Sequence, residues 1–378
     1  MNTCTVCGLE LFEQPLLRYE NMPKAAQFLP DADSFEDDKG VDLEVYQCSG
    51  CGLVQLSSDP VSYYRDVIRA AAFSEEMKSF RRKQFDDFVR SYNLHGKKVL
   101  EIGCGRGEYL SILRQSGVDA YGLEHLEDSV EKCLKQDLNV LFGFVESNRY
   151  KISHYPFDAF LMLNFLEHLP DPNATLRGIY NNMSDDAVGL VEVPNFDMIL
   201  RKKLFSEFMS DHLIYFTKDT LCTTLVINGF NVLECNETWH DYIISAVVRK
   251  RQQLDISEFN KSKSKLVNEL NKYISLFEDK KVAIWGASHQ AFAVMALANL
   301  SGKVKFVVDS AVFKQGKYTP ATHIPIVAPE TLNSDPVDAV IVMAASYSDE
   351  VAMILRRDFD RKMHVAVLRD YGLEHVEK

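Results

Sequence analysis

The stretch at residues 97–110 constrains the fold of this chain more than any other part of the sequence. An apolar segment, Lys97-Lys-Val-Leu-Glu101-Ile, has the length and composition of a strand buried in a parallel sheet. Glycines follow at three alternating positions, Gly103, Gly105 and Gly107, and then a helix begins. Glycines between a strand and a helix let the backbone approach a ligand at the helix N-terminus. The order strand, turn, helix therefore predicts an α/β domain with a ligand site at this turn.

The spacing of these glycines distinguishes between two nucleotide-type ligands. A dinucleotide fingerprint is Gly-x-Gly-x-x-Gly, but residue 108 is Glu and the third glycine comes one residue early. With Glu101 two residues before Gly103, the pattern is that of Rossmann-like methyltransferases that bind S-adenosylmethionine. The acid can receive the ammonium group of the methionyl part, directly or through water. We therefore expect Glu101, Gly103, Gly105 and Gly107 to bind S-adenosylmethionine, with no comparable binding of NAD.

The segments after the turn continue the α/β alternation. Residues 120–124 form a strand ending in Glu124, 23 residues after Glu101, where a carboxylate can hydrogen-bond the ribose hydroxyls. Residues 157–164 form a largely apolar strand ending at Asn164, which we also expect to bind the cofactor. The remaining predicted elements of this domain are a helix over 74–92 with Ser74 as its N-cap, a strand over 189–194 and a closing antiparallel hairpin over 230–248.

Four of the eight cysteines form two Cys-x-x-Cys pairs, Cys4 with Cys7 and Cys48 with Cys51, each followed by Gly-Leu. Turns of this kind point backbone amides at the thiolates, and two of them make a tetrahedral four-sulfur shell for Zn²⁺. Four thiolates leave no open position for a substrate, so we expect a structural zinc rather than a catalytic one. The other cysteines have no partner at ligand spacing and are not expected to bind metal: Cys104, Cys133, Cys222 and Cys235.

Composition excludes several classes of protein. The formal net charge is −12, which argues against nucleic-acid binding because such proteins carry a basic face for the phosphates. No apolar run approaches the roughly 18 residues of a membrane span. The first ten residues have neither the basic nor the apolar region of a secretory signal. We therefore expect a soluble cytoplasmic protein whose partner is a small molecule, with no nucleic acid and no membrane.

Candidate acceptor-binding residues follow the apolar strand over 157–164. Ligands of open α/β sheets bind outside the carboxyl ends of the strands, so His168 is placed where a methyl acceptor approaches. A second group, Asp211, His212 and Tyr215, lies on a later segment rich in aromatic residues. We predict that these four residues form the catalytic site. The alternative for His168 is a capping or packing role, and for His212 it is a surface histidine or one whose hydrogen bonds are satisfied within the protein.

The C-terminal part of the chain contains a second α/β alternation. A charged helix is predicted over 249–279, and strands over 281–285, 304–309, 337–344 and 363–368. As a dinucleotide site the turn after the first of these strands is degenerate, because Ser288 and Ala291 take two of the glycine positions. The pattern predicts a Rossmann-like shape and only weakly indicates NAD.

Over essentially all of its length the chain resembles the three-domain sugar C-methyltransferases of nucleotide-deoxysugar pathways. In that family a zinc-binding head precedes a class I methyltransferase core and a Rossmann-like C-terminal domain. The features that carry the resemblance are the two cysteine pairs, Glu101–Gly107, Glu167-His168 and the stretch 309–326. The resemblance implies a zinc-binding domain at 1–70, a methyltransferase domain at 71–250, and a Rossmann-like domain at 251–378 that binds a nucleotide-linked sugar.

The resemblance also implies a reaction: methyl transfer from S-adenosylmethionine to the carbon next to a keto group of a nucleotide-linked deoxysugar. The family has a Tyr-x-Glu-His stretch at the acceptor, but here Met209 and Asp211 take the tyrosine and glutamate positions. Methionine cannot relay a proton. If a proton is removed, a histidine is the favoured base because its unperturbed pKa lies near 6.5, and His168 follows a core strand directly.

Two alternatives stay open at this point. The first keeps the cofactor but methylates an oxygen or a nitrogen of another, nucleotide-linked or unrelated, acceptor, and Met209 favours it. The second is a non-catalytic protein that binds zinc and a nucleotide. The presence of Glu101, Glu124 and His168 argues against the second alternative.

Overall fold

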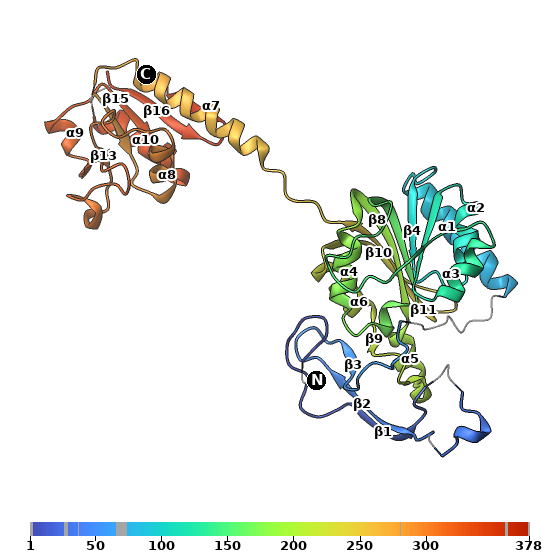
Figure 1. Cartoon of the computed structure of the whole chain (residues 1–378). Helices are drawn as coiled ribbons and strands as arrows, with labels where there is room; N and C mark the ends of the chain where they lie inside the picture. The colour runs from blue at the N-terminus through green and yellow to red at the C-terminus, as the bar shows by residue number, and fades with distance from the viewer. Residues whose placement is uncertain are drawn as a thin grey trace. The chain divides into compact units, whose positions relative to one another are not determined.

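The computed structural model describes residues 3–25, 29–36, 38–65, 74–279, 281–359 and 362–376. The chain divides into two compact units, Met1–Gln253 and Leu254–Lys378 (Figure 1). Within the described residues, no helix is both long enough and apolar enough to cross a membrane.

The centre of the first unit is a seven-stranded sheet with the order β10-β11-β8-β7-β4-β5-β6. Its strands are β4 (Lys98–Ile102), β5 (Asp119–Glu124), β6 (Asn139–Phe142), β7 (Phe157–Leu163), β8 (Met183–Pro194), β10 (Phe230–Thr238) and β11 (Ile243–Lys250). The strands from β8 to β6 are parallel, whereas β11 pairs antiparallel with both β8 and β10. The predicted Rossmann-like sheet with a closing hairpin is confirmed.

Helices cover both faces of this sheet. One face carries α1 (Glu75–Ser91), α2 (Glu108–Gln115) and α3 (Glu127–Leu134), and the other carries α4 (Pro172–Tyr180) and α6 (Lys218–Ile227) (Figure 1). The predicted cap of α1 is present, since the Ser74 hydroxyl accepts a hydrogen bond from the Met77 amide at 3.1 Å. The strand order reverses between β4 and β7, so the carboxyl ends of these two strands form the crevice where such sheets bind ligands.

The N-terminal head forms a separate four-stranded sheet of order β1-β2-β3-β9. Three strands come from the head itself: β1 (Leu17–Met22), β2 (Val41–Gln47) and β3 (Val54–Leu56). The fourth, β9 (Ile214–Tyr215), belongs to the segment that carries Asp211 and His212. The sequence did not predict this pairing. It means that the head holds one wall of the candidate acceptor site.

Four short elements complete the described part of the first unit. They are α5 (Phe196–Lys202) and the 3-10 helices η1 (Ala32–Ser34), η2 (Leu166–His168) and η3 (Phe205–Glu207). Phe196, Met198 and Ile199 of α5 pack into the head's core with Leu43, Val45 and Tyr215. This shared core holds the head against the segment between β8 and α6.

The second unit contains a six-stranded sheet of order β14-β13-β12-β15-β16-β17, parallel except for β17. Its strands are β12 (Val282–Trp285), β13 (Val307–Val308), β14 (Ile326–Val327), β15 (Ala339–Val342), β16 (His364–Arg369) and β17 (Gly372–Val376). The helices are α7 (Ser257–Ile274), α8 (His289–Leu297), α9 (Thr331–Ser334) and α10 (Ser348–Asp358), with 3-10 helices η4 (Val312–Lys314) and η5 (Ala345–Tyr347).

Two predicted boundaries of the second unit were wrong. The helix expected over 249–279 begins only at Ser257, because β11 extends through Lys250. The strand expected over 304–309 is reduced to Val307–Val308, although the Lys305 amide still donates to the Val282 carbonyl at 2.9 Å. The second Rossmann-like sheet is otherwise present as predicted.

Candidate active site

The glycine-rich turn connects β4 to α2 with three glycines of positive φ, Gly103, Gly105 and Gly107, at 65°, 58° and 85°. A Cβ on Gly103 would lie 3.1 Å from the ring of Phe165, and one on Gly107 only 2.4 Å from Leu138. Both positions therefore require glycine, for φ and for space. Gly105 differs, because the nearest atom to its Cβ would be 3.8 Å away, so the open side of the turn is at Gly105.

Glu124 ends β5 beside this turn, as predicted, and is 7% exposed. Its carboxylate accepts hydrogen bonds from the amides of Gly105, at 2.8 Å, and of His125 and Leu126, each at 2.9 Å. These bonds fix the carboxylate at the edge of a cleft lined also by Gly103, Phe144 and Phe165. A carboxylate can accept more than three hydrogen bonds, so one ribose hydroxyl can still donate to Glu124.

Two further predicted cofactor residues lie at the same edge of the sheet. Glu101 is fully buried at the end of β4. Asn164 follows β7 with φ of 49°, and its amide donates to the Glu192 carbonyl at 2.8 Å. The buried Asn164 Oδ1 has no hydrogen-bond partner among the described residues. A glycine turn, two acids and a buried unpartnered acceptor form a donor and acceptor set that fits S-adenosylmethionine.

His168 lies in η2 (Leu166–His168), directly beyond β7, and is 6% exposed. Its Nδ1 is 2.6 Å from the backbone carbonyl of Asp211. A carbonyl only accepts, so Nδ1 carries the proton and Nε2 keeps its lone pair. Nε2 faces the Glu167 carboxylate at 3.8 Å. Burial lowers the pKa of His168, so the imidazole is neutral at pH 7 and able to take up a proton.

His212 and Asp211 are brought to His168 from the segment before β9. The two imidazole rings lie with centroids 4.7 Å apart, nearly perpendicular. Burial and the neighbouring His168 lower the pKa of His212 to about 3. The Asp211 carboxylate points elsewhere, accepting a hydrogen bond from the Tyr63 hydroxyl at 2.6 Å. Asp211 therefore orients His168 through its backbone and offers its side chain to Tyr63.

Tyr215, the fourth predicted catalytic residue, directs its hydroxyl to the backbone of Met209 and not to His168 or His212. The hydroxyl accepts from the Met209 amide at 3.0 Å and lies 3.4 Å from the Met209 carbonyl. Burial raises the pKa of Tyr215 well above its usual value. The ring packs against Phe196 and Phe208 in the head's core. These contacts indicate that Tyr215 stabilises the conformation of the loop from Met209 to Tyr215.

Sequence reasoning missed three contributors to the site. Glu167, 1% exposed, faces His168, and only its position before that histidine could have indicated it. Tyr63 and Arg65 come from the segment after the head, where no spacing or periodicity marks them. Arg65 lines the cleft at Glu124, its guanidinium 5.2 Å from the Phe144 ring centre, and pairs with Glu146 at 3.2 Å.

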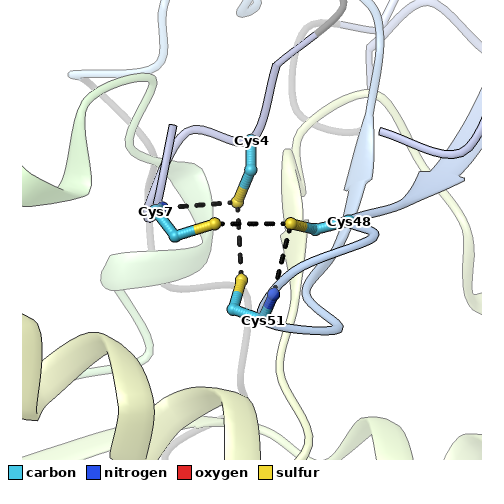
Figure 2. A group of neighbouring side chains, drawn as sticks. All are labelled: Cys4, Cys7, Cys48 and Cys51. Carbon is cyan, nitrogen blue, oxygen red and sulfur yellow. Dashed lines mark hydrogen bonds between the residues drawn. The ribbon is translucent and has the colours of Figure 1, made fainter. Parts of the chain in front are cut away.

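The four cysteines of the head converge in the geometry expected of a metal centre (Figure 2). The Cys4 and Cys51 sulfurs are 3.6 Å apart and those of Cys7 and Cys48 are 3.4 Å apart. A tetrahedral zinc shell with bonds of about 2.3 Å separates its sulfurs by about 3.8 Å, so small movements suffice. Burial raises the pKa of Cys48, but amides of Cys51 and Gly50 more than offset this and lower it to about 7.

One other group of described side chains could hold a cation. The ligating atoms of Glu167, His168 and His212 all lie within 4.8 Å of one another. The cysteines predicted not to bind metal, Cys104, Cys133, Cys222 and Cys235, belong to neither group in the part of the chain that the structure describes.

Fold and site together define a class I, Rossmann-like methyltransferase. The family model "Methyltransferase domain" matches residues 74–235, and "C-methyltransferase C-terminal domain" matches residues 253–365. The chain is 22% identical over 384 residues to the C-methyltransferase NovU of Streptomyces niveus, covering 93% of this chain and 91% of that protein. These similarities support a C-methyltransferase family for the chain, and the chain is an S-adenosylmethionine-dependent methyltransferase.

Two more distant similarities concern the methyltransferase part. A ubiquinone biosynthesis O-methyltransferase of Methylococcus capsulatus is 31% identical over 91 residues, covering 22% of this chain and 38% of that protein. A solved S-adenosylmethionine-dependent methyltransferase of Clostridium acetobutylicum has a TM-score of 0.39 at 12% identity, covering 50% of this chain and 96% of that one.

Proposed function

We propose that this enzyme methylates the carbon next to a keto group of a nucleotide-linked deoxysugar, and that its second unit binds the nucleotide-linked sugar. The observation that carries the proposal is the buried, neutral His168 with Nδ1 fixed on the Asp211 carbonyl and Nε2 beside Glu167. Such an imidazole suits the removal of a proton from carbon. The family and the relative NovU, a C-methyltransferase, support the choice of carbon as acceptor.

Bound S-adenosylmethionine supplies an activated methyl group, so the chain's own task is to make the acceptor carbon nucleophilic. His168 takes the proton from the carbon beside the keto group, and the carbon then forms its new bond to the methyl as the sulfur keeps the electron pair. Glu167, at 3.8 Å from Nε2, stabilises the imidazolium that forms. Tyr63 supplies a hydroxyl in a site where Met209 has none, and its single proton, donated to the Asp211 carboxylate in this structure, would have to turn to the developing enolate oxygen to stabilise it.

We also infer that Cys4, Cys7, Cys48 and Cys51 bind one structural zinc ion. Each sulfur-bearing turn points two amides at a thiolate, for example those of Gly50 and Cys51 at Cys48, at 3.3 and 3.4 Å. Elemental analysis should give one zinc per chain. If the analysis gives two zinc ions per chain, and Glu167→Gln loses one of them, the second ion is assigned to Glu167, His168 and His212.

The reaction is tested by incubating the enzyme with S-adenosylmethionine and a panel of nucleotide-linked keto-deoxysugars. We expect a product heavier by one CH₂ whose NMR spectrum places the methyl on carbon. Without methyl donor, in deuterated water, the acceptor should exchange the hydrogen next to its keto group, and His168→Ala should abolish this exchange. The Tyr215→Phe variant is the matched control and should keep it.

The second candidate is methylation of an oxygen or a nitrogen, which Met209 favours because no tyrosine takes part at that position. Methyl transfer to oxygen or nitrogen does not require removal of a carbon-bound hydrogen. A methylated product without hydrogen exchange, its methyl attached to oxygen or nitrogen, would replace the main proposal.

A further inference from the structure

A buried arginine beside the cofactor turn has hydrogen-bonding capacity that its neighbours do not use. Arg81 lies on α1 and is 0% exposed. Its Nη1 donates to Gln84 Oε1 at 2.7 Å and to Glu192 Oε2. Burial lowers the pKa of Arg81, but Glu192 and Tyr109 outweigh this and raise it, so the guanidinium is charged.

The other edge of the same guanidinium is unsatisfied. Arg81 Nε and Nη2 are buried and have no hydrogen-bond partner among the described residues. Leaving buried donors unpaired is destabilising, and native proteins rarely do so without a reason. The Nε and Nη2 edge presents two parallel N–H groups, the arrangement that binds both oxygens of one carboxylate.

Arg81 is placed at the cofactor turn by contacts on two sides. Its guanidinium lies 4.8 Å from the ring centre of Tyr109, which is in the first turn of α2, two residues after Gly107. Its partner Glu192 is buried near the end of β8, opposite Leu163 in the strand register, and its carbonyl binds the Asn164 amide. The guanidinium that carries the unsatisfied edge therefore lies between the residues that flank the turn and those that flank Asn164.

We propose that Arg81 binds the carboxylate of the methionyl part of S-adenosylmethionine through Nε and Nη2. Glu101, whose side chain lies on the same face of the sheet as that of Glu192, would receive the ammonium of the same group. The amino-acid part of the cofactor is a zwitterion, so one buried cation and one buried anion match it. The inference rests on cofactor binding and is independent of the acceptor.

The experiment compares three ligands by calorimetry: S-adenosylhomocysteine, its decarboxylated analogue, and methylthioadenosine, which lacks the whole amino-acid part. The wild-type enzyme should bind S-adenosylhomocysteine about 10- to 100-fold more tightly than the decarboxylated analogue, the usual effect of a charged hydrogen bond. Arg81→Gln should lose this preference while binding methylthioadenosine as before. Arg82→Gln, the neighbouring exposed arginine, is the matched control and should keep the preference.

Because Arg81→Gln leaves Glu192 buried without its cation, the double variant Arg81→Gln/Glu192→Gln is measured beside it. Methylthioadenosine affinity shows whether each variant has kept its fold. A wild-type enzyme that binds the decarboxylated analogue as tightly as S-adenosylhomocysteine overturns the proposal, as does a preference that persists in both variants. Loss of methylthioadenosine binding in both variants also overturns it, since Arg81 is then a structural residue. If no adenosine ligand binds the wild type, the cofactor assignment fails instead.

Discussion

The two parallel sheets of this chain each have a glycine-containing turn followed by a strand that ends in an acid, yet the two acids are used differently. Glu124 accepts hydrogen bonds only from backbone amides, and no cationic side chain pairs with it among the described residues. Asp309 accepts from the Ala287 and Ala311 amides and is paired with Lys314 at 3.0 Å. The Glu124 carboxylate is thus held by amides, whereas the charge of Asp309 is paired within the chain itself.

The glycines of the two turns show the same difference. A Cβ at Gly286 would lie 2.4 Å from the Met343 carbonyl, so this turn is closed against the end of β15. A Cβ at Gly105 would meet no atom closer than 3.8 Å. Lys314 also donates to the Ala287 carbonyl at 2.9 Å and so ties the second turn to η4. A strand, a turn and a distant acid thus recur in both units, and the two turns differ in the space left beside their glycines.

The largest expected effect concerns the head, whose sheet holds β9 and so supports the segment that carries Asp211 and His212. The described part of the second unit has no such sheet. Removing the metal with a chelator, or changing Cys48 to Ser, should abolish methyl transfer, because β9 loses the sheet that holds it. Structural zinc contributes on the order of 10 kcal/mol in small domains. Hydrogen exchange should rise over residues 209–216 and stay unchanged over β12. Equal protection of the residue 209–216 amides from exchange, with and without metal, would show that the head does not support the site. The control for Cys48→Ser is Cys235→Ser, which changes a cysteine outside the four-cysteine group.

The next largest effect is on turnover, and it should differ between variants of His168, which follows β7, and of His289, which follows β12. His168→Ala should lower turnover by about 100-fold or more, the usual scale for a general base, and leave cofactor affinity intact. His289, exposed at the start of α8, is the matched position in the second unit, and His289→Ala should change turnover little. Steady-state kinetics with the identified acceptor tests both. Full turnover in the His168 variant would reassign this histidine to packing.

The predictable parts of this molecule are the local ones. The strands around Glu101, Glu124 and Asn164 follow from short apolar runs bounded by turn residues, and each acid is where the strand end places it. The Tyr63–Asp211 hydrogen bond joins residues 148 positions apart, and a single sequence has no periodicity that records it. β9 has only two residues, too few for an alternating pattern, so the head's contribution to the site could not be predicted.

The third test compares cofactor affinity in variants of Glu124 and Asp309, the acids at the strand ends beside the two turns. Glu124→Ala should weaken binding of S-adenosylhomocysteine by about 1–3 kcal/mol, because it removes a charged hydrogen-bond partner. Asp309→Ala should leave that affinity unchanged and instead destabilise the second unit, since Lys314 and two amides lose their acceptor. Calorimetry and thermal unfolding separate the two outcomes. Unchanged affinity in the Glu124 variant would mean that this carboxylate does not face the ribose.

The smallest effect is a difference in pH dependence between the two units. The pKa of His212 is lowered from 6.5 to about 3 by burial and by His168, so in the folded state it resists protonation. Between these two values the unfolded chain binds more protons, and the stability of the first unit should fall as pH decreases from about 6.5. The slope is at most about 1.4 kcal/mol per pH unit for each such histidine.

The second unit should respond only at lower pH. Burial raises the pKa of Asp309, but the amides and Lys314 outweigh it and hold the pKa below its usual value, so its contribution is lost only below about pH 4. The chain's two tryptophans, Trp239 and Trp285, fall one in each unit, so Trp239→Phe and Trp285→Phe let fluorescence follow each unit alone. Urea unfolding at pH 7 and 5 should shift the midpoint of the first unit only, and His212→Gln should reduce that shift. Equal shifts in both units, or a shift that His212→Gln leaves unchanged, would contradict the assignment of this pH dependence to the acceptor site.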